Sequence, residues 1–112
     1  MYLAYRYAEK NEKLNEALKL AQEAKEKNPN DPGITDTLGW VYYKKGLYDN
    51  AINKFLSSVK DLPDNATVHY HLGMAYFKKG ETDGAKTALE RALDLNAKFE
   101  NADHARQILS SL

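Results

Sequence analysis

The chain has 112 residues, in which 16 lysine and arginine residues balance 16 aspartate and glutamate residues. This length suits one small domain or a short repeat array without a separate substrate domain, and the zero net charge argues against a nucleic-acid binder, which needs excess basic residues. The absence of cysteine excludes disulfides, cysteine nucleophiles and cysteine-based zinc sites, and no apolar run approaches the roughly 18 residues of a membrane span.

The chain repeats itself, and its first copy, residues 1–31, is incomplete. The second helix of this copy is intact, with small or turn residues at the repeat positions Ala17, Ala21, Ala24 and Pro29. Its first helix contributes Leu3, Ala4 and Tyr7, but the turn at 11–13 holds one extra residue and lacks a glycine. On this alignment Met1 falls inside the first helix. We therefore expect the chain to be the C-terminal fragment of a longer array, or to start abnormally.

Residues 32–65 form the first complete copy and are predicted to hold two helices. Asp31 and Pro32 begin the first helix, because aspartate accepts backbone hydrogen bonds as an N-cap and proline suits the first helical position. Gly46 ends it, since glycine readily adopts the left-handed conformation that follows many helices. Apolar residues recur at helical spacing in this helix and in a second one over 48–61, namely Ile34, Leu38, Val41, Tyr42, Ala51, Ile52, Phe55 and Val59.

Residues 66–99 repeat this plan 34 residues later. Eight residues of the preceding copy are found again, unchanged, 34 positions later: Leu38, Gly39, Tyr42, Lys44, Lys45, Gly46, Asp49 and Ala51. Asn65 is the expected N-cap of a helix over 66–79, Gly80 is its expected C-cap, and a second helix is predicted over 82–95. Such a period decides the architecture, because each copy must pack against its neighbours.

Residues 100–112 are predicted to contribute a capping helix at the end of the array. The apolar stripe of this helix, over 101–112, holds Ala102, Ala105, Ile108, Leu109 and Leu112. Its other face is polar, as the terminal unit of a repeat array requires.

The repeated residues resemble the signature of the tetratricopeptide repeat (TPR) family along almost the whole chain. The second copy carries Leu38, Gly39, Tyr42, Ala51, Phe55, Ser58 and Pro63, and the third carries Leu72, Gly73, Tyr76, Ala85, Leu89, Ala92 and Ala97. The departures are Thr35 and His69 for a tryptophan, Ser58 for a second small alanine, and Ala97 for proline. The resemblance implies an all-α fold, a right-handed α-solenoid of stacked antiparallel helix pairs, with residues 1–112 forming a single TPR array.

Packing explains most of the conspicuous residues. Gly39 and Gly73 lie in the middle of helices, where glycine costs roughly 1 kcal/mol relative to alanine, so we expect a partner helix to approach closely there. Tyr42 and Tyr76 are predicted to lie in the core between the two helices of each copy. The histidines lack metal-ligand spacing, and no nucleophile with a base and no acid pair is readable. We predict no metal, no cofactor and no enzymatic activity.

The resemblance implies a concave side lined by the first helix of each copy, where a peptide or partner helix binds. Carried over by position, this groove contains Tyr5, Asp36, Trp40, Tyr43, Lys44, Tyr70, Met74, Phe77 and Lys78. We expect its aromatic row to be exposed and to take an apolar or aromatic segment, with the two lysines facing an acidic flank. The alternative is that the row packs internally or against helices outside this sequence. The lysine, asparagine and arginine clamp with which some members hold a C-terminal carboxylate is absent.

Two functions remain open at this stage. The first is a scaffold module that binds a protein segment in the concave groove, without nucleic acid and without membrane insertion. The second is a structural segment that ends a solenoid or pairs two copies through apolar residues of the N-terminal end, namely Tyr2, Leu3, Leu14, Leu18 and Ala21. Arrays of this style resemble bacterial scaffold and secretion-associated proteins. A soluble array without cysteine suits the cytoplasm and the periplasm equally.

Overall fold

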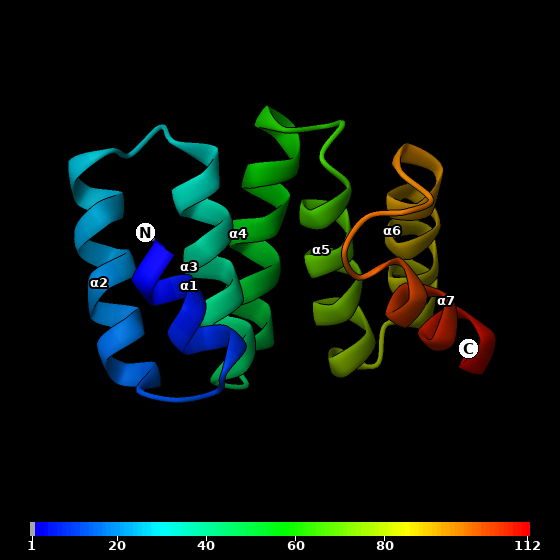
Figure 1. Cartoon of the computed structure of the whole chain (residues 1–112), viewed down its shortest axis with the longest axis horizontal. Helices are drawn as coiled ribbons and strands as arrows, with labels where there is room; N and C mark the ends of the chain where they lie inside the picture. Colours follow the sequence, from blue (N-terminus) through cyan, green and yellow to red (C-terminus); the bar gives the residue numbers. More distant parts are fainter. Residues whose placement is uncertain (1) are drawn as a thin grey trace.

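The computed structural model describes residues 2–112, except for the side chain of Tyr2, and in this range it contains helices and no strand (Figure 1). The helices are α1 (Tyr2–Glu9), α2 (Leu14–Lys27), α3 (Pro32–Lys44), α4 (Tyr48–Asp61), α5 (Ala66–Lys79), α6 (Thr82–Leu95) and α7 (Ala102–Ser111). The predicted bounds of α4, α5 and α6 are confirmed without change. The expectation that Met1 belongs to the first helix concerns a residue outside the described range.

The helices stack as antiparallel pairs in chain order, so the fold is an all-α solenoid of the TPR type (Figure 1). The pairs are α1 with α2, α3 with α4, and α5 with α6. Between successive pairs, α2 packs on α3 and α4 packs on α5. In addition, α1 contacts α3 and α3 contacts α5. The first helices of successive pairs therefore lie side by side, and we call the surface they share the inner face.

The helix ends follow the predicted capping residues. The side chain of Asp31 accepts hydrogen bonds from the backbone N–H groups of Gly33 and Ile34, at 2.9 and 3.2 Å. The Asn65 side chain accepts one from the backbone of Val68 at 3.1 Å. Gly46 and Gly80 have φ angles of 80° and 90°, in the left-handed region that favours glycine.

The turn between α1 and α2 lacks such a glycine and adopts left-handed backbone with two other residues. Asn11 has a φ of 54° and Lys13 a φ of 50°. This conformation is uncommon for residues with a Cβ atom. The extra residue that the sequence shows in this turn therefore comes with a less favourable backbone than in the later turns.

The glycines of the repeat signature lie where two helices cross. A Cβ atom on Gly39 would lie 2.6 Å from the Phe55 ring, and one on Gly73 would lie 2.7 Å from the Leu89 side chain. Phe55 and Leu89 are fully buried, so neither has free space to yield. The predicted close approach of the partner helices is confirmed.

Three predictions about burial need correction. Tyr42 and Tyr76 pack against the core but are only half-buried, so neither ring is a fully buried core residue. Leu112 is 41% exposed and follows the end of α7, so it does not belong to the covered stripe. Ala21 is fully buried and Leu14 and Leu18 are half-buried, so among the described side chains of the predicted N-terminal surface only Leu3, at 51% exposure, is open. The Tyr2 side chain, also predicted to lie there, is outside the described part.

Candidate functional site

Aromatic side chains from α1, α3 and α5 meet on the inner face. We call the group of Tyr5, Trp40, Tyr43, Tyr70 and His71 the inner cluster. The Trp40 ring stacks on the Tyr43 ring with their centres 4.5 Å apart, and on the His71 ring with centres 4.2 Å apart. Tyr5 and Tyr70 approach His71 with ring centres at 6.3 and 5.9 Å. The predicted groove residues Tyr5, Trp40, Tyr43 and Tyr70 are therefore brought together.

The expectation that this aromatic row is exposed is wrong. Trp40 is 5% exposed, and Tyr43, Tyr70 and Met74 are also buried. The reason is that large side chains of neighbouring helices cover one another across the inner face. Internal packing, the alternative left open above, describes these residues. Of the predicted groove residues, Tyr5, Lys44 and Phe77 are half-buried and Lys78 is exposed.

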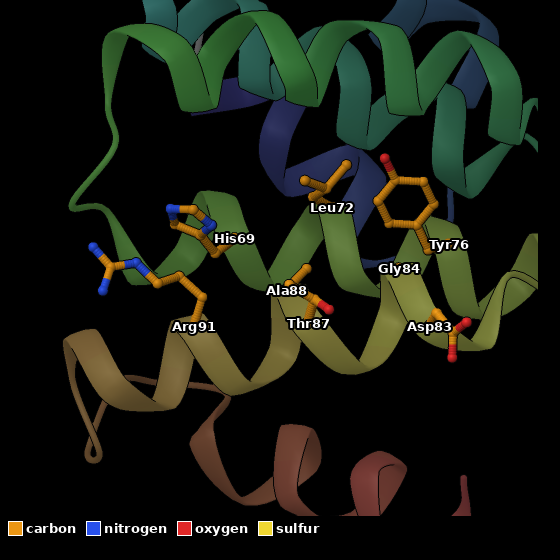
Figure 2. A pocket seen from close by; sticks show the side chains of 8 residues that line it. All are labelled: His69, Leu72, Tyr76, Asp83, Gly84, Thr87, Ala88 and Arg91. Atoms are coloured by element: carbon orange, nitrogen blue, oxygen red, sulfur yellow. The ribbon is translucent and has the colours of Figure 1, made fainter.

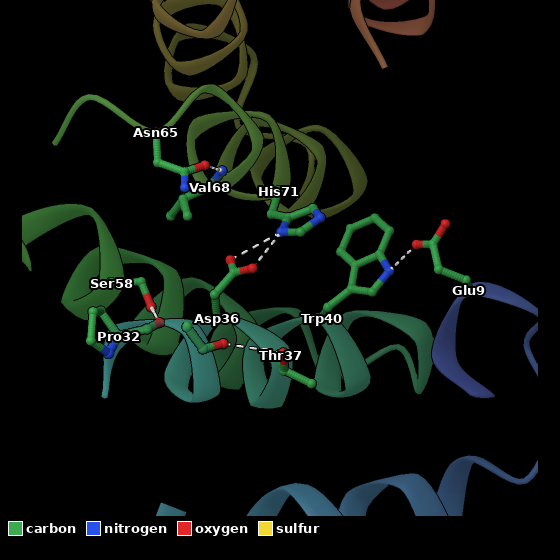
Figure 3. Close-up of polar contacts among 10 residues, drawn as sticks. Glu9, Pro32, Asp36, Thr37, Trp40, Ser58, Asn65, Val68 and His71 are labelled. Carbon is green, nitrogen blue, oxygen red and sulfur yellow. Dashed lines mark hydrogen bonds and ion pairs between the residues drawn. The ribbon is translucent and has the colours of Figure 1, made fainter. Parts of the chain in front are cut away.

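A buried ion-pair geometry joins α3 to α5 (Figure 3). Nδ1 of His71 lies 2.9 and 3.0 Å from the two carboxylate oxygens of Asp36. Because a carboxylate only accepts, Nδ1–H is the donor. Nε2 of His71 is buried and has no hydrogen-bond partner among the described residues. Asp36, predicted to face a ligand, thus holds the central histidine of the inner cluster instead.

Polar groups border the inner cluster at three points. The indole N–H of Trp40 donates to the Glu9 carboxylate at 2.5 Å (Figure 3). The Lys44 ammonium lies 5.1 Å from the centre of the Trp40 ring, within the range of a cation–π contact. The Tyr70 hydroxyl shares a hydrogen bond with Nδ1 of His104 at 2.6 Å. The rim is therefore charged or titratable, while the interior is aromatic.

Burial changes the acidity of the tyrosines in this cluster. Loss of solvation raises the pKa of Tyr70 to about 12, with a smaller contribution from the charge of Glu9. The pKa of Tyr43 is also raised, first by burial and then by Tyr70 and Tyr48. Burial followed by the nearby charges of Glu9, Asp36 and Glu100 raises the pKa of Tyr5. These hydroxyls stay protonated far above neutral pH.

The polar groups in and around the cluster form no metal site among the described residues. No group of three or more histidine, aspartate or glutamate side chains in residues 2–112 is arranged to hold a metal ion. Ser58, which departs from the repeat signature, donates its hydroxyl to the backbone oxygen of Pro32 at 2.8 Å. His69, another departure, binds the backbone oxygen of Pro63 at 2.8 Å. Ser58 therefore joins α4 to α3, and His69 joins α5 to the turn that precedes it.

Sequence reasoning did not place Glu9, His71 and His104 at this site. A signal existed for two of them, because Glu9 stands at the repeat position of Lys44 when the extra turn residue is allowed for, and His104 lies 34 residues after Tyr70. For His71, the repeat relation indicated no partner. Its role depends on Asp36, which the repeat relation does not pair with it.

Comparisons with known proteins address the family directly. A model described as "TPR repeat" matches residues 39–80, and one described as "Tetratricopeptide repeat" matches residues 66–99, so together they span more than half of the chain. The chain belongs to the tetratricopeptide-repeat family. A TPR repeat-containing protein of Pseudomonas aeruginosa, PA4667, is 34% identical over 71 residues, which are 63% of this chain and 12% of that protein. This TPR chain thus spans a small part of that relative.

Solved structures share the fold. The type III secretion translocator chaperone SycD of Yersinia enterocolitica superimposes with a TM-score of 0.85 at 21% identity, covering 98% of this TPR chain and 86% of that chain. SycD in complex with a peptide of the translocator YopD gives 0.83 at 21% identity, covering 98% and 86%. PcrH in complex with the chaperone binding region of PopB gives a TM-score of 0.82 at 20% identity, covering 96% of this chain and 90% of that chain.

No helix in the described part of the chain is long and apolar enough to span a membrane.

Proposed function

We propose that this TPR chain is a protein-interaction module that binds a peptide or partner helix on its inner face. The observation that carries the proposal is a row of exposed or half-buried side chains at equivalent repeat positions on α3 and α5. Lys44 on α3 and Lys78 on α5 lie at the same repeat position, and Phe77 precedes Lys78 as Tyr43 precedes Lys44. Tyr5 on α1 is half-buried and contributes a further partly open ring.

The charge and polarity of this row define the ligand. Phe77 and Tyr5 offer apolar surface that is already partly desolvated, and aromatic anchors of this kind dominate many interfaces. Lys44 and Lys78 offer positive charge to an acidic flank. The inner cluster supports Lys44, because the Lys44 ammonium lies over the Trp40 ring, which in turn stacks on Tyr43. The expected ligand is an apolar or aromatic segment followed by acidic residues.

The complexes among the solved structures support this proposal. SycD holds a peptide of YopD, and PcrH holds the chaperone binding region of PopB. At 20–21% identity they share the fold with this chain, and they demonstrate that an array of this shape accommodates a peptide. Which segment binds here has to come from an unbiased selection.

The experiment is a selection of peptides from a random library on the intact chain, followed by titration of the enriched peptides. Trp40 is the one tryptophan, so its fluorescence reports on changes at the inner face. We expect enriched peptides to carry an aromatic or large aliphatic residue next to acidic residues. Phe77→Ala is expected to cost about 2 kcal/mol of binding free energy if Phe77 is an anchor.

Charge reversal on the inner face gives a second readout. Lys44→Glu with Lys78→Glu is expected to weaken the selected peptides about tenfold or more. Lys60→Glu, at an exposed position of α4, is the matched control and is expected to leave binding unchanged. Equal affinity for the wild type, for Phe77→Ala and for the double lysine variant would remove the inner face as the binding site.

A second candidate function is self-association through the N-terminal end, where Leu3 is 51% exposed. Sedimentation over a concentration series tests it. A strict monomer at high concentration contradicts it, and a dimer that Leu3→Ser dissociates supports it.

A further inference from the structure

A hollow lies between α5 and α6, separate from the filled inner cluster. Leu72 and Tyr76 of α5 and Gly84 and Ala88 of α6 form its floor (Figure 2). We call this hollow the outer groove. Its volume is about 490 Å³, which is in the range of ligand-binding pockets. It shares no lining residue with the inner cluster.

The preceding helix pair provides an internal reference for the outer groove. There, Tyr42, Asn50, Asn53 and Lys54 border a smaller hollow of about 330 Å³. At the equivalent positions 34 residues later, Gly84 stands in place of Asn50, Thr87 in place of Asn53 and Ala88 in place of Lys54. The outer groove is therefore larger and more apolar than its counterpart, because three polar side chains became small.

The helix above the groove changes in the same direction. On α2, Gln22 donates a hydrogen bond to the Tyr42 hydroxyl at 3.5 Å, and Lys25 donates one to Thr35 at 2.7 Å. The equivalent residues on α4 are Leu56 and Val59. Leu56 is 49% exposed, although an aliphatic side chain gains nothing from water. On α6 and on the preceding helix α4, smaller or apolar residues thus replace larger polar ones of the copy before.

Gly84 deepens the groove without any backbone requirement for glycine. Its φ is not positive, unlike those of Gly46 and Gly80. A Cβ atom at this position would lie 3.0 Å from the Tyr76 ring. The glycine therefore lets the Tyr76 ring rest on α6, and this position leaves space above the ring.

Opposite charges mark the two ends of the groove. Asp83 and Arg91 both line it and lie eight residues apart on α6, which is about 12 Å at the helical rise. Arg91 is 3.6 Å from Asp64, a side chain that is 85% exposed. An exposed pair of this kind contributes little free energy, so Arg91 can exchange Asp64 for another acidic group.

We propose that the outer groove binds an amphipathic helix of another protein. One large aliphatic side chain of that helix enters the hollow over Leu72 and Ala88. An acidic side chain four residues to one side faces Arg91, and a basic side chain four residues to the other side faces Asp83. Residues spaced in this way on one helix also span about 12 Å, so the charges match the groove in sign and in distance.

The test uses a designed helical peptide with glutamate, leucine and lysine at successive intervals of four residues in an alanine-rich background. Amide signals of the ¹⁵N-labelled chain are followed by NMR as the peptide is added. We expect saturable shifts at Leu72, Gly84, Thr87 and Arg91, while signals of Asn50 and Asn53 stay in place. A peptide with serine in place of leucine is expected not to bind.

Variants taken from the preceding pair supply matched controls. Ala88→Lys copies Lys54 and is expected to weaken the peptide about tenfold or more, whereas Lys54→Ala is expected to leave its affinity unchanged. Thr87→Asn, at an exposed position, also narrows the groove and keeps the test valid if Ala88→Lys does not fold. Arg91→Glu is expected to weaken binding, and a peptide with lysine in place of glutamate is expected to restore it.

Several results would overturn the proposal. Shifts confined to the inner cluster would place the peptide on the other face. Equal binding of the serine peptide, or no effect of Thr87→Asn and Arg91→Glu, would remove the outer groove as the site. Saturable shifts with cyclohexanol but not with the peptide would identify a cavity for small molecules only. Shifts that appear on concentrating the chain alone and vanish in Thr87→Asn would identify a second copy as the occupant.

Discussion

On the inner face, the indole of Trp40 is covered by side chains of α1, α3 and α5, whereas on the other side the ring of Tyr76 borders a hollow. Both regions are lined by aromatic and aliphatic residues. The difference is the size of the side chains opposite them. His71, Tyr43 and Tyr70 surround Trp40, but Gly84 and Ala88 face Tyr76. The size of the side chains that face an aromatic residue therefore decides whether it is core or surface.

The largest effect that tests this comparison is the loss of the two aromatic rings. Trp40→Ala is expected to destabilise the fold by about 3–5 kcal/mol, because it leaves a cavity in a filled region. Tyr76→Ala is expected to cost about 2 kcal/mol, since the ring is half-buried and already borders open space. Urea unfolding followed by circular dichroism measures both. Equal losses would show that the two regions are packed alike.

The Asp36–His71 pair tests whether the inner cluster depends on its polar contact. Asp36→Ala is expected to cost about 1–3 kcal/mol, because Nδ1–H of His71 remains buried without an acceptor. Combining Asp36→Leu with His71→Phe removes both polar groups and is expected to recover most of that loss. A double-mutant cycle on urea unfolding gives the coupling. Additive losses from the two single substitutions would argue that the pair contributes nothing specific.

These two cases also show what could be predicted from the sequence. The period of 34 residues, the caps Asp31 and Asn65, and the glycines Gly46 and Gly80 fixed the helices. Those features are local or repeat at a constant interval. Two other contacts are not local. The Trp40–Glu9 contact joins residues separated by 31 positions, and the Asp36–His71 contact joins residues separated by 35 positions. Both depend on how one copy is tilted on the next.

The outer groove can be predicted from the sequence in part. The alignment of the two copies shows Asn50, Asn53 and Lys54 replaced by Gly84, Thr87 and Ala88. The residues that the copies share define the fold, whereas the residues that differ define this groove. Exposure on the inner face, by contrast, required the sizes and rotamers of side chains from three helices, which a pattern of residue types does not contain.

Alkaline pH sharpens the comparison, because buried tyrosines hold their protons longer in the folded state. The pKa of Tyr70 rises from 10.0 to about 12 on folding. Above about pH 10 the unfolded chain loses this proton first, so each further pH unit costs about 1.4 kcal/mol of stability until the folded pKa is reached. Below that window the contribution is complete and constant. Tyr5 and Tyr43, whose pKa values are also raised by burial, add to the loss.

The substitution Tyr70→Phe measures how much Tyr70 contributes to the loss of folding stability at alkaline pH. The variant is expected to lose stability less steeply than the wild type between about pH 10 and 12, with urea midpoints at neutral pH as the reference. Parallel profiles of the two proteins in that range would mean that Tyr70 is not held in its neutral form by burial.

The smallest effect is a gain of stability in the outer groove. Gly84→Ala relieves the conformational cost of glycine on α6 and is expected to stabilise the fold by about 0.5 kcal/mol. The new Cβ atom meets the Tyr76 ring at 3.0 Å, but that ring borders the hollow and has room to move. The matched substitution Gly73→Ala is expected to have the opposite sign, with a loss of about 1–3 kcal/mol. There the Cβ atom meets Leu89 at 2.7 Å, and Leu89 is fully buried. Thermal and urea unfolding of the two variants side by side measure the difference, and a loss in both would mean that the outer groove is as tightly packed as the helix crossing.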